Sequence, residues 1–128
     1  MYPLDREQVL ERLSEGVSRH TLVCEKWATL IQMAQEYPQH IERDDLNEGC
    51  AYCLTSNSEY GGCKSCPFYN YYGYTCDDSL DGPWYKASMA YEDWKLDHGE
   101  HTQALMINAF IDMHSALVEI PDEEEKND

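Results

Sequence analysis

The chain has 128 residues, 42% of them hydrophobic, which suits one globular domain of ordinary size. Nine Lys and Arg residues against 25 Asp and Glu residues give a formal net charge of −16. A field of that sign repels nucleic-acid phosphates and anionic membrane surfaces. The composition therefore argues against both partners and favours a protein partner with a basic surface.

The redox state of the six cysteines depends on the compartment in which the protein works. No stretch approaches the roughly 18 consecutive apolar residues of a membrane helix, and residues 1–7 lack the apolar core of a signal peptide. We therefore expect an intracellular protein whose thiols stay reduced. In such a compartment, cysteines are more often metal ligands than disulfide partners.

Residues 4–37 carry a helical pattern. Asp5 is predicted to cap its start, with Gln8 as the capping-box partner three residues on. Gly16 is expected to divide the stretch into two helices, and Tyr37-Pro38 to end the second. The apolar face of the first helix holds Val9, Leu10, Leu13 and Val17, and that of the second holds Val23, Trp27, Leu30, Ile31 and Ala34.

The middle of the chain lacks long periodic runs. Residues 38–48 are polar and acidic and are predicted to form a connecting loop. Residues 49–83 hold five of the six cysteines together with several glycines. This composition is typical of a loop-rich segment that a metal ion organises.

The last third returns to helical periodicity. One helix is predicted over 84–98, with Gly99 as its C-terminal stop, and another over 101–120, followed by a frayed acidic tail at 121–128. Their apolar faces consist of Trp84, Ala87, Tyr91 and Trp94, and of Met106, Ala109, Phe110, Met113, Leu117 and Ile120. The expected fold is mainly α: a single domain of three or four helices around one core, with an inserted loop-rich segment that binds zinc through four cysteines.

The cysteine spacing indicates a metal centre. Cys50, Cys53, Cys63 and Cys66 form two C-x2-C pairs separated by nine residues. Two such pairs supply the four soft ligands of a tetrahedral Zn²⁺ site, so we expect one structural zinc ion. An iron–sulfur cluster is the alternative, because Cys66-Pro67 matches the Cys-Pro that closes some ferredoxin motifs. Buried cysteines without a ligand are the third possibility.

Further candidate ligands lie outside these four. Cys76 is a fifth thiol, which could stand beside the metal ligands, be unliganded, or replace one of the four. Cys24 falls beside the apolar face of the second helix, where a small buried hydrophobe is expected. His98 and His101 straddle a helix boundary with no third ligand nearby in the sequence, which is typical of surface histidines.

The order of cysteines, prolines and aromatic residues resembles that of small phage and prophage proteins of unassigned function. The pattern is carried here by Lys26-Trp27, Cys50-Ala51-Tyr52-Cys53, Cys63-Lys64-Ser65-Cys66-Pro67, Gly73, Cys76 and Pro83-Trp84. The resemblance covers about residues 18–94. It implies metal binding and a phage origin, hence the cytoplasm of a bacterial host, and it supplies no activity.

The residue types favour a binding protein over an enzyme. Four thiolates close a zinc site, whereas a catalytic zinc keeps one position open, and no deaminase, phosphate-loop or nucleophile-elbow motif is present. Aromatic residues of the cysteine-rich segment suit a protein interface or a cover for the metal loop: Tyr60, Phe68, Tyr69, Tyr71, Tyr72, Tyr74 and Trp84.

We therefore expect a non-enzymatic modulator or inhibitor that binds a host or phage protein. A DNA mimic that inhibits a nucleic-acid-binding protein, with residues 77–81 and the acidic tail in place of phosphates, is a second hypothesis. A component of an iron–sulfur or other metal-dependent enzyme is a third.

Overall fold

The computed structural model describes residues 2–55 and 66–122, and within these ranges every regular element is helical. In chain order the elements are α1 (Arg6–Ser14), α2 (Arg19–Glu36), the 3₁₀ turn η1 (Pro38–His40), α3 (Arg43–Asn47), α4 (Ala51–Thr55), α5 (Pro67–Tyr72), α6 (Pro83–Leu96) and α7 (Glu100–Glu119). The mainly α prediction is confirmed. No helix in the described part of the chain is long and apolar enough to cross a membrane.

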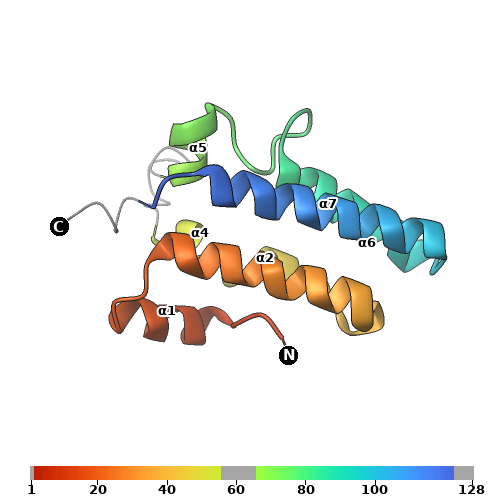
Figure 1. Ribbon diagram of the computed structural model, residues 1–128, viewed down its shortest axis with the longest axis horizontal. Coiled ribbons are helices and arrows are strands. Elements are labelled where there is room, and N and C mark those ends of the chain that lie inside the picture. Colours follow the sequence, from red (N-terminus) through yellow and green to blue (C-terminus); the bar gives the residue numbers. More distant parts are fainter. Residues whose placement is uncertain (1, 56–65, 123–128) are drawn as a thin grey trace.

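Three long helices form the body of the molecule. In Figure 1, α2 and α7 run antiparallel side by side, and α6 runs back along α7. The short helix α1 lies along α2, while α4 and α5 lie at the end where α2 begins and α7 finishes. The two short helices that follow Cys50 and Cys66, α4 and α5, therefore lie at one end of the helical body.

The start of the chain follows local sequence rules. Asp5 caps α1: its side chain accepts from the Gln8 backbone N–H at 2.9 Å, and the Gln8 side chain accepts from the Asp5 N–H at 3.0 Å. This is the capping box that the sequence predicts. Gly16 has a φ of 95°, and α2 begins after the N-cap Ser18. Two helices therefore replace one long helix.

The core is built from the predicted apolar faces. Trp27, Leu30 and Ala34 of α2 are buried against Met106, Phe110, Met113 and Leu117 of α7, with Ala87, Tyr91 and Trp94 of α6 completing the cluster. The Trp27 and Phe110 rings meet edge to face, with centroids 5.4 Å apart. Leu10 is an exception, because it is exposed on the outer side of α1. Leu13 and Val17 are partly buried against the same core.

Two sequence expectations are wrong. Residues 38–48 form the turn η1 and the helix α3 rather than a loop, since Tyr91 donates to the Ile41 carbonyl at 2.9 Å and an Arg43–Glu92 ion pair ties α3 to α6. Gly99 does not terminate α6, which ends at Leu96. It precedes α7 instead, with its N–H donating to Thr102 Oγ1 at 3.1 Å.

The α2–α7 contact yields a stability test. Phe110→Ala removes a ring that is fully buried against Trp27. We expect a loss of about 3–5 kcal/mol in the free energy of unfolding, measured by chemical denaturation. Leu105→Ala on the exposed side of the same helix is the matched control, with an expected change within about 0.5 kcal/mol. Equal losses in the two variants would contradict this assignment of the core.

Candidate metal centre

A buried lysine joins the helical body to the cysteine-rich segment. Lys26 on α2 is 5% exposed, and its ammonium donates to the carbonyl oxygens of Leu46 (3.1 Å) and Glu48 (2.7 Å). The Leu46 carbonyl also accepts from Trp84 Nε1 at 3.0 Å. Lys26 therefore caps the end of α3 and fixes the backbone that leads into Cys50.

Cys50 and Cys53 form a hydrogen-bonded pair at the start of α4. The Cys53 thiol donates to Cys50, and this bond is the main cause that lowers the pKa of Cys50. The Lys26 ammonium and the backbone N–H groups of Cys53 and Tyr52 act in the same direction, while burial opposes them. The pKa of Cys53 is raised, first by its bond to Cys50 and then by burial. Of the two groups, Cys50 is therefore the easier to ionise.

Cys66 and Cys76 belong to the same neighbourhood. Both are partly buried against the core, and the Cys53 sulfur interacts electrostatically with Cys50, Cys76 and Cys66. Lys26 in turn interacts with Cys50, Cys53 and Cys76. Three thiols, Cys50, Cys53 and Cys76, therefore act on one buried cation, and Cys66 at the N-terminus of α5 acts on Cys53.

The donor set suits a soft metal ion, since four thiols and no carboxylate make up the group. Among the residues that the structure describes, however, no three His, Cys, Asp or Glu side chains stand in an arrangement that already matches a metal site. Of the four predicted ligands, Cys50, Cys53 and Cys66 are described, and Cys63 lies outside the described residues. A metal ion bound by these thiols would replace their protons, including the one shared between Cys53 and Cys50.

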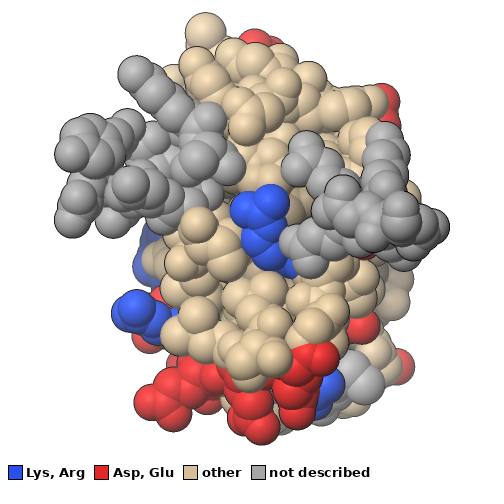
Figure 2. All heavy atoms as spheres, turned by 90° about the vertical axis from the view of Figure 1, so that its left-hand side faces the viewer, with Lys and Arg blue, Asp and Glu red and all other residues tan. Residues whose placement is uncertain are grey.

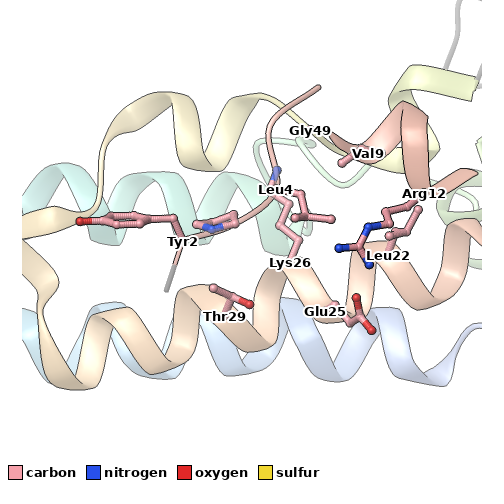
Figure 3. Close-up of a pocket in the computed structure, with 10 residues that line it drawn as sticks. Tyr2, Leu4, Val9, Arg12, Leu22, Glu25, Lys26, Thr29 and Gly49 are labelled. Carbon is pink, nitrogen blue, oxygen red and sulfur yellow. The ribbon is translucent and has the colours of Figure 1, made fainter. Parts of the chain in front are cut away.

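Two small hollows adjoin the lysine and the thiols. In Figure 3, Lys26 rises from α2 toward Gly49 and Leu4, beside a cavity of about 190 Å³ with Arg12 and Glu25 along its wall. A second hollow of about 230 Å³ is lined by Arg6, Cys50 and Cys53. This second hollow gives the thiol pair a route to solvent by which an ion could enter.

Cys24 has a different environment. Its sulfur lies 3.7 Å from His20 Nε2, and His20 Nδ1 lies 3.2 Å from the Tyr52 hydroxyl oxygen. Burial raises the pKa of Cys24 to about 11, with the charge of Asp122 adding to the effect. A thiol with so high a pKa is a poor nucleophile. The Cys24–His20 pair is therefore a packing contact within α2, and His20 joins α2 to Tyr52 of α4.

The predicted interface aromatics have unequal positions. Phe68 is fully buried and serves the core of this end of the molecule, packed against Tyr72 and Tyr74 with ring centroids 4.7 and 5.9 Å away. Tyr72 also donates to the Ala116 carbonyl of α7 at 2.6 Å. Tyr71 is 46% exposed. Tyr69, Tyr74 and Trp84 are half-buried, and Tyr60 lies outside the described residues.

The histidines near residue 100 do not join the thiols. The ring of His98 stacks on Trp94, with centroids 4.1 Å apart and planes 8° from parallel. His101 is exposed in the first turn of α7. The role of Lys26 is the functional feature that residue patterns missed. Its signal is a lone lysine inside the apolar face of α2, next to Trp27.

No family model matches the chain, and no curated protein or solved structure is significantly similar to it.

Gly49 provides a test of the approach to Cys50. Its φ is 75°, and a Cβ there would lie 2.7 Å from the Leu4 carbonyl oxygen. Gly16 also has a positive φ, but a Cβ there would meet nothing within 4 Å. Gly16→Ala should therefore cost only the conformational strain, about 1–2 kcal/mol, whereas Gly49→Ala should cost more in urea unfolding. Deleting residues 1–4 should remove the excess. Equal losses in the two full-length variants would show that Leu4 does not press on Gly49.

Proposed function

We propose that this is a small acidic protein of phage type that holds one structural zinc ion through thiolates and acts by binding another protein. Its role would be to modulate or inhibit a host or phage protein. The observation that carries the proposal is the set of three thiols, Cys50, Cys53 and Cys76, whose charges act on the buried Lys26, with Cys66 acting on Cys53. A buried ammonium is costly unless it is paired, and thiolates on a metal ion are a suitable counter-charge.

Charge supports a metal centre held by four thiolates. Four thiolates and one Zn²⁺ carry a net charge of −2, which the ammonium of Lys26 reduces to −1 in a partly buried site. The hydrogen bonds from backbone N–H groups to Cys50 are of the kind that stabilises a thiolate. An ion with four soft ligands and no open position organises the chain but does not activate water. This is why we favour a binding role.

The surface supports a protein partner. Figure 2 shows the end of the molecule that carries α5, where uncharged surface predominates and Asp and Glu residues gather below it. Tyr71 is exposed on α5, and Leu80 is 81% exposed in the loop before α6. Exposed aromatic and aliphatic side chains on a molecule with a net charge of −16 suit a partner that combines apolar and basic groups.

DNA mimicry receives less support from the described residues. Within 77–81, the Asp78 carboxylate accepts from the N–H groups of Leu80 (2.8 Å) and Asp81 (3.2 Å), so it serves the turn rather than a partner. The acidic tail beyond residue 122 lies outside the described residues. The partner experiment described below therefore includes DNA mimicry as one of its possible outcomes.

The metal is tested first. Protein purified without added metal should contain about one zinc ion per chain by elemental analysis. Cys53→Ser removes a ligand at the pair and should lower the zinc content to well under half, while Cys24→Ser should retain it. Iron in place of zinc, together with visible absorption, would indicate an iron–sulfur cluster instead of a zinc ion. Wild-type protein without metal and with intact helical circular dichroism would contradict the proposal.

The partner is tested with the zinc-loaded protein as bait. Capture from bacterial lysate should recover one stoichiometric protein, and Tyr71→Ala together with Leu80→Ala should weaken its binding by at least about tenfold. Met89→Ala, a similarly exposed apolar residue on α6, is the control. Binding that falls steeply with salt and competes with DNA would indicate mimicry instead. Capture that these two substitutions leave unchanged would contradict the proposed surface.

A further inference from the structure

We propose that the hollow between the start of the chain and the turn η1 binds the guanidinium group of an arginine on the protein partner. The hollow has a volume of about 410 Å³, large enough for a side chain, and is lined by Tyr2, Gln39, His40, Glu42 and Asp45. None of these residues is a cysteine. The inference therefore rests on the proposed protein partner but not on the metal ion.

The aromatic side of the hollow is assembled from two distant parts of the chain. Pro3 holds the residue before it in an extended backbone, and the Tyr2 side chain extends away from Lys26 (Figure 3). The Tyr2 hydroxyl oxygen lies 3.2 Å from His40 Nδ1. The ring of His40 stacks on those of Tyr2 and Tyr37, with centroids 6.3 and 5.8 Å away and planes 19° and 24° from parallel. Three nearly parallel rings therefore offer flat π faces.

Two carboxylates line the same hollow. Asp45 lies in the first turn of α3, where its Oδ2 accepts from the Glu42 N–H at 2.8 Å. Its charge also acts on the Lys26 ammonium. Glu42 is the N-cap of α3 and is exposed. Among the described residues, neither carboxylate forms an ion pair with a lysine or arginine. The hollow thus combines aromatic faces with negative charge that is open to a ligand.

This combination favours an arginine as the occupant. A cation is attracted both by the face of an aromatic ring and by a carboxylate. The guanidinium group is planar, stacks on flat rings and pairs with a carboxylate through two N–H groups, whereas the lysine ammonium is a compact point charge. The Tyr2 ring is still 60% exposed although it stacks on His40, so surface remains for a second contact. The net charge of −16 repels anionic ligands and attracts a basic partner.

The test uses the wild-type chain and N-acetyl-arginine amide as a probe for an arginine within a protein. Titration followed by NMR should give saturable shifts at residues 2 and 37–45, with a dissociation constant on the order of 10 mM. N-acetyl-citrulline amide has the same shape without the charge and should give no saturable shift. Equal binding of the two compounds would overturn the proposal.

Free arginine distinguishes a partner's side chain from a small-molecule ligand. Its own carboxylate meets the same negative charge, so it should bind at least about threefold more weakly than the capped probe. Tighter binding of free arginine would indicate a site for a small molecule and overturn the assignment to a partner.

Variants separate the hollow from the overall charge. Glu42→Gln keeps an oxygen that can cap α3 but removes the charge, and it should weaken binding of the capped probe at least about threefold. Glu11→Gln removes an exposed charge on α1 that does not line the hollow, and it should leave binding unchanged. Equal effects of the two variants would overturn the site. Capture of a partner by a chain that does not bind the probe would contradict this site alone. Probe binding without any captured partner would contradict the proposed function instead.

Discussion

The burial of the Lys26 ammonium is the constraint on which this end of the molecule depends. A charged amine that is only 5% exposed loses most of its hydration free energy. Hydrogen bonds and nearby negative charge must compensate for that loss. The carbonyls of Leu46 and Glu48 accept its hydrogen bonds. Counter-charge comes from the Asp45 carboxylate and from Cys50, Cys53 and Cys76 to the extent that these thiols are ionised. Burial lowers the pKa of Lys26, and the negative groups around it oppose that shift. Lys26 and Cys50 therefore favour each other's charged forms.

The helical body and the cysteine-rich end are stabilised in different ways. The α2–α7 and α6–α7 contacts bury aliphatic and aromatic side chains, an effect that requires no ion. The other end has a smaller apolar centre around Phe68 and relies on hydrogen bonds to backbone carbonyls, such as that from Tyr72 to Ala116. The body can thus act as a rigid support for the smaller cluster around Phe68.

Sequence patterns predict best where neighbours in the chain decide the structure. The Asp5–Gln8 capping box, the break at Gly16 and the apolar stripe of α7 all depend on residues within a few positions of one another. Sequence patterns predict poorly where contacts between residues far apart in the chain determine the structure. Residues 38–48 are polar, yet contacts with α6 hold them in η1 and α3. Gly99 has the residue type of a helix stop, but its N–H donates to the Thr102 side chain and it precedes α7 instead.

In the candidate site, too, local spacing predicts better than distant contacts. The spacing of Cys50 and Cys53 predicts that both sulfurs lie on one side of a turn, and the two thiols share a hydrogen bond. The neighbourhood of Cys76 could not be read from spacing, because it is set by the first turn of α6 and by Trp84 reaching α3. The hydrogen bonds of Lys26 could not be predicted from the sequence either, since its partners lie 20 and 22 residues further along the chain.

Gly82 shows how the turn before α6 can be recognised in other chains. Its φ of −68° is open to any residue, so glycine is required here by space rather than by conformation. The carbonyl of Cys76 and the backbone of Asp78 fill the position of its Cβ. A side chain at this position and a tight Cys76 turn exclude each other. Because these are backbone atoms that any residue would supply, a glycine before Pro83-Trp84 in related sequences should mark the tight turn itself, whichever residue stands at position 76.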